Sequence, residues 1–328
     1  MKLAYFDDYR LGVVIGTGIV DVSGELRDLP RRAPEDLMAA LIEHFGEYRA
    51  RIEEAVISGK PIPLAEVKFR MPLPRPHAIV CMAVNYDDGL LKSAHTNAFH
   101  KSPSALIGCD ETLVLPDVPA SVFEGEAEMA VVIGKKATNV DAEHAMNYVF
   151  GYVNFIDGSA RDLQPATNSF FQMKSRDTFA PIGPYIVTRD EIPDPQNLQI
   201  RLWVNGEIKQ DFNTRKMITG VGDSVAWVSA IQTLMPGDIL ATGTDHCGLN
   251  AFQHGDIVEL ETEGLGRLRV NVRDDLKRTW SRELRIDRHK IGANSRNERL
   301  WNGSPQPPLR FTVRPKQEAH GRCCAGFA

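Results

Sequence analysis

A close succession of short strand patterns between residues 79 and 272 is the feature that most constrains the fold of this chain. Each run is rich in apolar and β-branched residues and is bounded by turn residues, which is typical of β-strands. Asn205-Gly206, between two of the runs, indicates a hairpin. Helix patterns in this region are confined to about 142–148 and 223–234. We therefore predict an α+β protein, rich in strand, whose core is closed into a barrel or folded as a sandwich.

The first 70 residues follow a different pattern and predict a small N-terminal α/β domain. Two strand runs between residues 11 and 22 are separated by a glycine turn. One helix pattern follows, with apolar residues at steps of three and four from Leu37 to Val56. Three prolines between 72 and 76 then indicate a linker, so we place the main domain at residues 71–280.

The segment 281–328 differs from both. It contains ten Lys and Arg against four Asp and Glu, and a proline-rich run at 304–308 interrupts it. Little apolar periodicity follows that run. We interpret this segment as a basic tail that is mobile or loosely docked. The alternative is an arm that covers a partner subunit.

Charge, hydropathy and cysteine usage exclude several classes of protein. A net charge of −5 does not suggest the clustered basic surface that nucleic acid requires. No apolar run reaches the roughly 18 residues of a membrane span, and the first residues do not form a secretory signal. The five cysteines are scattered without metal-ligand spacing, as expected of reduced thiols. We expect a cytoplasmic protein that binds neither nucleic acid nor membrane.

Three glutamates at alternate positions lead into an apolar strand run. Alternation places Glu124, Glu126 and Glu128 on one face of a strand, and the run from Met129 to Ile133 implies that this strand is partly buried. Like charges at this spacing repel one another unless a cation neutralises them. Carboxylate oxygens are hard ligands, so we predict Mg²⁺ or Mn²⁺, with Ca²⁺ as a further option. A solvated edge strand is the alternative interpretation.

A second acidic cluster follows a strand run whose pattern ends at Asp157. A side chain at the end of a buried strand can turn into a cleft. Arg161, Asp162 and Gln164 supply donors and acceptors around it. For Arg161 we favour an ion pair with Asp162 over a contact to substrate.

These motifs resemble those of the fumarylacetoacetate hydrolase superfamily over residues of about 72 to 272. The family pattern of Glu-x-Glu before an apolar strand matches Glu126 and Glu128, and its Asp-x-Ser-x-Arg-Asp-x-Gln motif begins at Asp157. Further matches, in the family order, are the run from Lys174 to Pro184, Pro236-Gly237-Asp238 and Thr242-Gly243-Thr244. Several motifs in the correct order are more specific than any one alone.

The resemblance implies a β-rich, barrel-like C-terminal fold, a β-roll, usually assembled as a homodimer. It implies that Glu126, Glu128 and Asp157 hold Mg²⁺ or Mn²⁺, which leaves Glu124 as an additional carboxylate. The implied substrate is a small 2-oxo or β-diketo acid that chelates the metal through its carboxylate and oxo oxygens.

The resemblance also implies contacts to substrate. Gln164, Lys174 and Thr244 match positions at which the family contacts substrate, and Arg161 lies in the same motif as Gln164. Polarisation of the oxo group stabilises an enolate, the intermediate common to C–C hydrolysis, decarboxylation and tautomerisation. Lys174 could stabilise the developing oxyanion, and Thr244 could donate a hydrogen bond to substrate.

The general base is where the sequence departs from the family. Many members carry Asn-Tyr-x-x-His-x-x-Glu, in which the His–Glu pair activates water, but Gly89 and Lys92 stand at those two positions. His95 and His100 follow in a predicted lid loop and could replace the missing histidine. Asp87 or Asp88 could also serve.

We therefore predict a metal-dependent hydrolase or lyase that cleaves a C–C bond in an acylpyruvate-like or fumarylpyruvate-like acid, in the breakdown of aromatic or sugar-derived compounds. Loss of the usual dyad leaves open an isomerase, a hydratase or an oxaloacetate-type decarboxylase on a related acid. A catalytically silent homologue that binds a metabolite is the alternative from another class.

Overall fold

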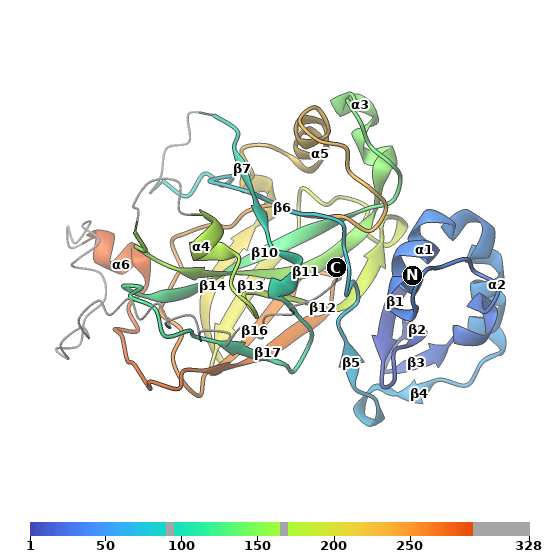
Figure 1. The fold of residues 1–328 in the computed structure, drawn as a ribbon, viewed down its shortest axis with the longest axis horizontal. Coiled ribbons are helices and arrows are strands. Elements are labelled where there is room, and N and C mark those ends of the chain that lie inside the picture. Colours follow the sequence, from blue (N-terminus) through green and yellow to red (C-terminus); the bar gives the residue numbers. More distant parts are fainter. Residues whose placement is uncertain (90–94, 165–169, 291–328) are drawn as a thin grey trace, which may run out of the picture.

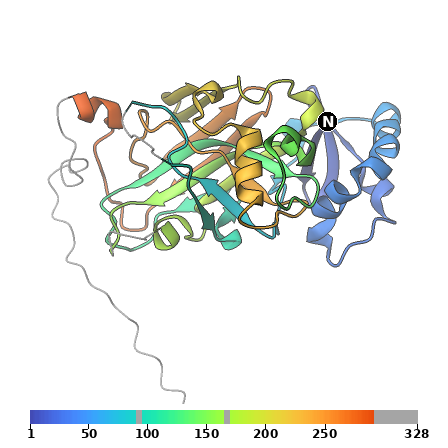
Figure 2. The same ribbon diagram turned by 90° about the horizontal axis from the view of Figure 1, so that it is seen from above.

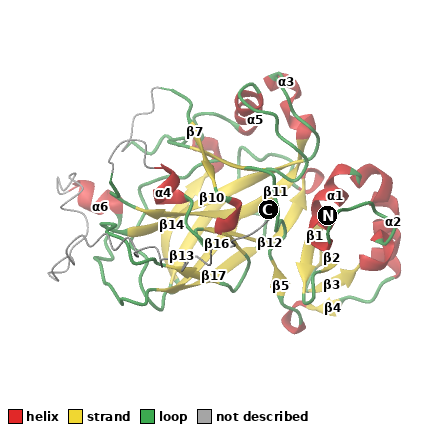
Figure 3. Cartoon of the chain, viewed as in Figure 1, coloured by secondary structure: helices red, strands yellow, loops and turns green. Residues whose placement is uncertain are grey.

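The computed structural model describes residues 1–89, 95–164 and 170–290, and within them the chain forms two β-sheets (Figures 1 and 3). The larger sheet has twelve described strands. In spatial order they are β4 (Ile62–Pro63), β3 (Gly18–Asp21), β2 (Arg10–Ile15), β1 (Lys2–Phe6), β12 (Ala180–Thr188), β11 (Val149–Ala160), β10 (Phe123–Ile133), β15 (Ile239–Ala241), β6 (Ile79–Met82) and β7 (Ala98–Lys101), with β5 (Phe69–Arg70) on β1 and β8 (Leu106–Ile107) on β12.

The smaller sheet has five described strands and packs against the middle of the larger one. Its order is β14 (Glu207–Asn213), β13 (Gln199–Val204), β16 (Ile257–Thr262), β17 (Arg267–Arg273) and β9 (Thr112–Val114). The predicted hairpin at Asn205-Gly206 is confirmed, since this pair joins β13 to β14 with φ values of 54° and 80°. Strands β13, β16 and β17 contact β10, β11 and β12, so the main core lies between the two sheets.

The helices are short and lie outside the sheets. They are α1 (Leu37–Glu43), α2 (Phe45–Ser58), α3 (Ala142–Ala145), α4 (Phe170–Lys174), α5 (Val221–Ser229) and α6 (Arg285–Lys290). The α4 helix contacts β7 and β11, and α3 contacts α5. No helix of the described residues is both long enough and apolar enough to cross a membrane.

The architecture is a sheet-rich mixed α+β fold, as the strand patterns predicted. The barrel-like closure is not found, because the larger sheet of the described residues runs as an open path from β4 to β7. Strand β10 is buried along its whole length. Its odd-numbered residues from Ala127 to Ile133 face the core between the sheets, whereas Ala130 and Val132 belong to a second core on the opposite side.

The N-terminal strands extend the larger sheet. Strand β1 pairs antiparallel with β12, with Lys2 opposite Val187, and the blue N-terminal segment gathers at one end of the molecule in both views (Figures 1 and 2). The single helix expected from Leu37 to Val56 is divided into α1 and α2 at His44, whose ψ of 16° interrupts the helical geometry. The break allows Phe45 to pack edge-to-face on Phe150, with the ring centroids 5.0 Å apart. A domain boundary near residue 70 stays a prediction.

Candidate metal centre

The central carboxylates are brought together by the register of two neighbouring strands. Glu126 on β10 lies directly opposite Asp157 on β11, and Glu128 is two residues further along the same face of β10. One carboxylate oxygen from each of the three lies within 4.8 Å of those of the other two. All three residues are buried, at 6%, 1% and 1% exposure for Glu126, Glu128 and Asp157. Asp157 lies inside β11 rather than at the end of a strand, because the strand continues to Ala160.

Two buried lysines contact this cluster. Lys174, at the end of α4, places its Nζ atom 2.8 Å from Glu126 Oε2 and 2.5 Å from Asp157 Oδ2. Lys101, at the end of β7, places its Nζ atom 2.5 Å from Asp157 Oδ1 and also donates to the main-chain oxygens of Gly158 and Lys174. Burial alone would lower the pKa of Lys174, but Asp157 and Glu126 raise it above its usual value. Lys174 is thus held as a cation beside the carboxylates.

Glu124 is neutralised separately, by two arginines. Arg161 Nε lies 2.8 Å and Arg285 Nη2 2.7 Å from Glu124 Oε2, and Arg161 also donates to Glu126. Burial would raise the pKa of Glu124, but Arg285 and Arg161 hold it below its usual value. The pairing favoured from the sequence, Arg161 with Asp162, is therefore not what the structure shows for Arg161. Asp162 accepts a hydrogen bond from Ser121 instead.

Glu128 differs from its neighbours because, within the described residues, no ion pair involves it. Its Oε2 atom accepts a hydrogen bond from the main-chain N–H of Gly243 at 2.7 Å. Burial, together with the charges of Asp157 and Glu126, raises the pKa of Glu128 well above its usual value. By contrast, Lys174 and Arg161 overcome the effect of burial and lower the pKa of Glu126. A hard divalent cation among the three carboxylates would supply a positive charge next to Glu128, which has no ion-pair partner among the described residues. The donor set therefore fits Mg²⁺ or Mn²⁺.

The turn after β15 forms one wall of this centre. Thr242 pairs with Met129 through its main-chain N–H and its hydroxyl group, and this pairing places the Gly243 N–H on Glu128. The next residue, Thr244, is buried, and its Oγ atom lies 2.9 Å from Gln210 Nε2. Gln210 also accepts a hydrogen bond from Ala127 of β10. Thr244, a predicted substrate contact, therefore lies beside the strand that carries the carboxylates.

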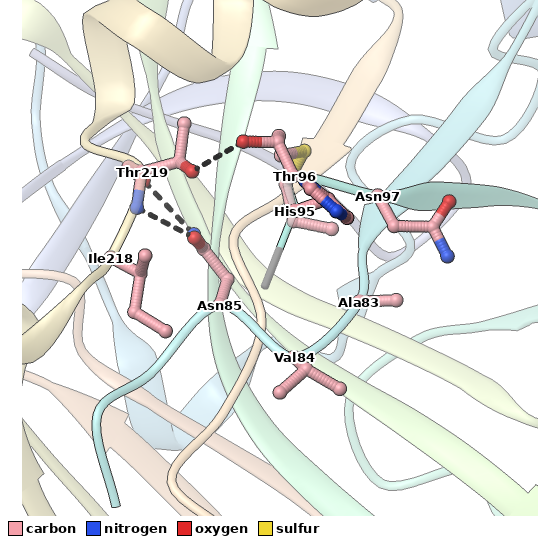
Figure 4. A pocket seen from close by; sticks show the side chains of 9 residues that line it. Ala83, Val84, Asn85, His95, Thr96, Asn97, Ile218 and Thr219 are labelled. Atoms are coloured by element: carbon pink, nitrogen blue, oxygen red, sulfur yellow. Dashed lines mark hydrogen bonds between the residues drawn. The ribbon is translucent and has the colours of Figure 1, made fainter. Parts of the chain in front are cut away.

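Three further predicted site residues lie at the surface. Gln164 is exposed, and its main-chain oxygen accepts a hydrogen bond from Gln172. His100 is exposed on β7, and its main-chain oxygen is 3.5 Å from the Ser175 hydroxyl. His95 is exposed beside a small pocket of about 120 Å³ (Figure 4). None of the contacts found among the described residues joins these three side chains to the carboxylates.

The predicted lid loop is partly a strand. Residues 98–101 form β7, which pairs with β6, and Lys92 lies outside the described residues. Lys101 is not predicted from the sequence, because a lone lysine after a polar stretch gives no local signal. Only the pairing of β7 with β6 and the position of α4 direct its side chain to Asp157.

Fold and site together define a class: a sheet-rich α+β protein with a buried centre of three carboxylates and two lysines. The family model described as the C-terminal domain of fumarylacetoacetate (FAA) hydrolase matches residues 78–273. The chain belongs to this family of enzymes, as the order of the motifs predicted.

Relatives cover most of the chain. The maleylpyruvate hydrolase of Aquipseudomonas alcaligenes is 36% identical over 291 residues, which are 83% of this chain and 99% of the relative. A mitochondrial oxaloacetate tautomerase of Rattus norvegicus is 37% identical over 266 residues, which are 77% of this chain and 83% of the relative. The solved structure of maleylpyruvate hydrolase from Sphingobium sp. SYK-6, in complex with manganese(II) and pyruvate, matches with a TM-score of 0.76 and 37% identity, covering 84% of this chain and 99% of that one.

Proposed function

We propose that the protein is a divalent-metal-dependent hydrolase that cleaves the C–C bond of a small acylpyruvate-type acid, with Glu126, Glu128 and Asp157 as the metal ligands. The observation that carries this proposal is the buried carboxylate cluster, in which Glu128 has no cationic partner among the described residues. The Sphingobium relative, which contains manganese(II) and pyruvate, supports it.

The chain's own groups fit this chemistry. When bound, the cation supplies Lewis-acid polarisation of the 2-oxo group of the substrate. Lys174 holds a positive charge at Glu126 and Asp157, where negative charge develops on the substrate as the C–C bond breaks. Because Gln210 donates to the Oγ atom of Thr244, the hydroxyl hydrogen of Thr244 is free to donate to a substrate oxygen.

Tautomerisation of oxaloacetate is the second candidate function. The similarity to the rat tautomerase and the absence of the usual His–Glu dyad at Gly89 and Lys92 favour it. Both reactions use an enolate of a 2-oxo acid, and they differ in whether water attacks a second carbonyl carbon.

A metal-supplemented substrate panel tests the proposal. Purified protein with Mn²⁺ or Mg²⁺ is given maleylpyruvate, other acylpyruvates and oxaloacetate, and pyruvate release and enol absorbance are recorded. The expected result is release of pyruvate and a second acid from an acylpyruvate, which stops when EDTA removes the metal. Loss of the enol absorbance of oxaloacetate, without release of pyruvate from any acylpyruvate, would favour the tautomerase. Absence of any thermal stabilisation at millimolar metal would contradict both functions and favour a silent homologue.

Further predictions belong to this proposal. Mg²⁺ fits the same oxygen donors as Mn²⁺. A role in aromatic compound catabolism would follow from an acylpyruvate substrate, and a cytoplasmic location stays a prediction. A homodimer is expected from the family resemblance, and light scattering on the purified protein would test it. The division into domains at residues 70 and 280 stays part of the proposal, and limited proteolysis would test it.

A further inference from the structure

His246, on the turn after β15, forms a close pair with Asp88, which lies in the segment after β6. The Nδ1 atom of His246 lies 2.7 Å from Oδ2 of Asp88, and the main-chain N–H of His246 donates to the same oxygen at 3.2 Å. The Asp88 carboxylate has no exposed surface, and the His246 side chain is 10% exposed. Because an ionised carboxylate can only accept hydrogen bonds, Nδ1 carries the hydrogen, and Nε2 of the neutral ring keeps a lone pair.

The segment that carries Asp88 is fixed on both sides. The Asn85 side chain donates to the main-chain oxygens of Thr219 and Thr242, at 3.0 and 2.9 Å, and accepts from Thr219 N–H at 2.8 Å (Figure 4 shows Asn85 and Thr219). Asp87 N–H donates to the Lys216 oxygen. Val84, just before this segment, has a φ of +55°, which is unusual for a β-branched residue. Such strain persists where the surroundings demand one conformation, as at functional sites.

The pair lies near the metal centre along the chain. His246 is three residues from Gly243, whose N–H binds Glu128, so its Cα atom is at most about 11 Å from that of Gly243. It is two residues from the predicted substrate contact Thr244. In its protonated form, the His246 ring would also lower the pKa of Glu126, so the ring is within electrostatic range of that carboxylate.

From this geometry we infer that His246 is the general base of the reaction and that Asp88 is its positioning residue, replacing the His–Glu dyad that Gly89 and Lys92 have lost. The inference rests on the proposed function and deepens it. Asp88 was one of several alternatives offered by the sequence, but its partner was not identified, because 158 residues separate the two.

The proton balance follows from these roles. In hydrolysis, Nε2 accepts a proton from water while the water oxygen forms a bond to the distal carbonyl carbon. The C–C bond then breaks, its electron pair passes to the pyruvate enolate, and the proton on Nε2 passes to the enolate carbon. With pyruvate alone, Nε2 accepts a methyl proton and returns a solvent proton to the same carbon. Asp88 stays ionised throughout and stabilises the imidazolium.

Deuterium uptake tests the inference separately from hydrolysis. Wild type, His246→Gln, His246→Ala and Asp88→Asn, each with Mn²⁺, are incubated with pyruvate in D₂O and analysed by mass spectrometry, and acylpyruvate cleavage is measured in parallel. His144→Gln, on the exposed surface of α3, is the matched control. Thermal stabilisation by Mn²⁺ shows for each variant that the metal centre is intact.

The expected result is a loss of at least about 100-fold in exchange and cleavage for His246→Gln, with Mn²⁺ stabilisation retained. Added imidazole should restore part of the activity of His246→Ala, which a merely structural role would not allow. Asp88→Asn should lose roughly tenfold or more in kcat with little change in KM, and Asp88→Glu should recover part of it. If His246→Gln does not fold, imidazole rescue of His246→Ala and the kcat of Asp88→Asn test the inference instead.

Two outcomes would overturn the inference. One is exchange by His246→Gln within threefold of wild type, and the other is absence of exchange in the wild type. Exchange in the wild type without cleavage of any acylpyruvate would overturn the proposed hydrolase instead, and the loss of exchange in His246→Gln would still support the base.

Discussion

The two ends of the glutamate row on β10 are neutralised in different ways. At one end, Glu124 lies between Arg161 and Arg285, and its charge is balanced within the chain. At the other end, Glu128 receives one main-chain N–H, and no ion pair of the described residues reaches it. Glu126 lies between these two ends, and Asp157 lies opposite it on β11. Both of these carboxylates contact Lys174. The difference separates a carboxylate that stabilises the fold from one whose charge is available for a ligand.

Catalysis should show the contrast most strongly. Glu126→Gln removes a charged metal ligand and is expected to lower metal-dependent cleavage by about 1,000-fold or more, because Lewis-acid polarisation contributes several kcal/mol. Glu124→Gln should lower it less than about tenfold, since this residue is outside the set of three. Steady-state kinetics with titrated Mn²⁺ measures both. Equal losses in the two variants would contradict the distinction.

The next largest effect concerns Lys101, which forms an ion pair with Asp157. Lys101→Met removes a charge whose side chain has no exposed surface, so Asp157 is left with Lys174 alone. We expect the free energy of unfolding to fall by about 3 kcal/mol, as when one partner of a buried ion pair is removed. Urea denaturation measures this, with the exposed Lys136→Met as control. A change below about 1 kcal/mol would show that Asp157 does not need Lys101.

The smallest effect is on the free energy of unfolding of the metal-free protein, which should change in opposite directions in two variants. Glu124→Gln should destabilise it by about 2 kcal/mol, because Arg285 loses the Glu124 carboxylate and Arg161 keeps only Glu126. Glu128→Gln should stabilise it by about 1 kcal/mol, because it removes the cost of burying this carboxylate as an ion or of protonating it. Urea denaturation in EDTA measures both, and destabilisation by Glu128→Gln would refute the contrast.

The same contrast predicts a dependence on pH. Burial raises the pKa of Glu128 in the folded protein, so the neutral form is favoured by folding. The metal-free wild type should therefore lose stability as the pH rises through this raised pKa, and Glu128→Gln should lose this dependence. Metal should reverse the trend, because its ligands must be deprotonated and binding strengthens with pH.

Local sequence patterns predicted much of the fold and part of the site. Alternation placed the three glutamates on one face, and the family resemblance singled out Glu126, Glu128 and Asp157, which the structure brings together. Contacts between distant segments gave no such signal. Lys101 reaches Asp157 only through strand pairing, and Asp88 meets His246 across the two segments that Asn85 ties together. The break between α1 and α2 is likewise a packing effect, since the apolar spacing continues through it.

The α6 helix limits how far the chain can be shortened from its C-terminal side. A version that ended at Arg278 would keep every described strand of both sheets. It would nevertheless lose Arg285, and with it one cation at Glu124 and a main-chain hydrogen bond to Leu249. Leu249 belongs to the turn that carries His246. Shortened versions meant for crystallisation or fusion should therefore retain the chain through Lys290, even though α6 itself contributes nothing to either sheet.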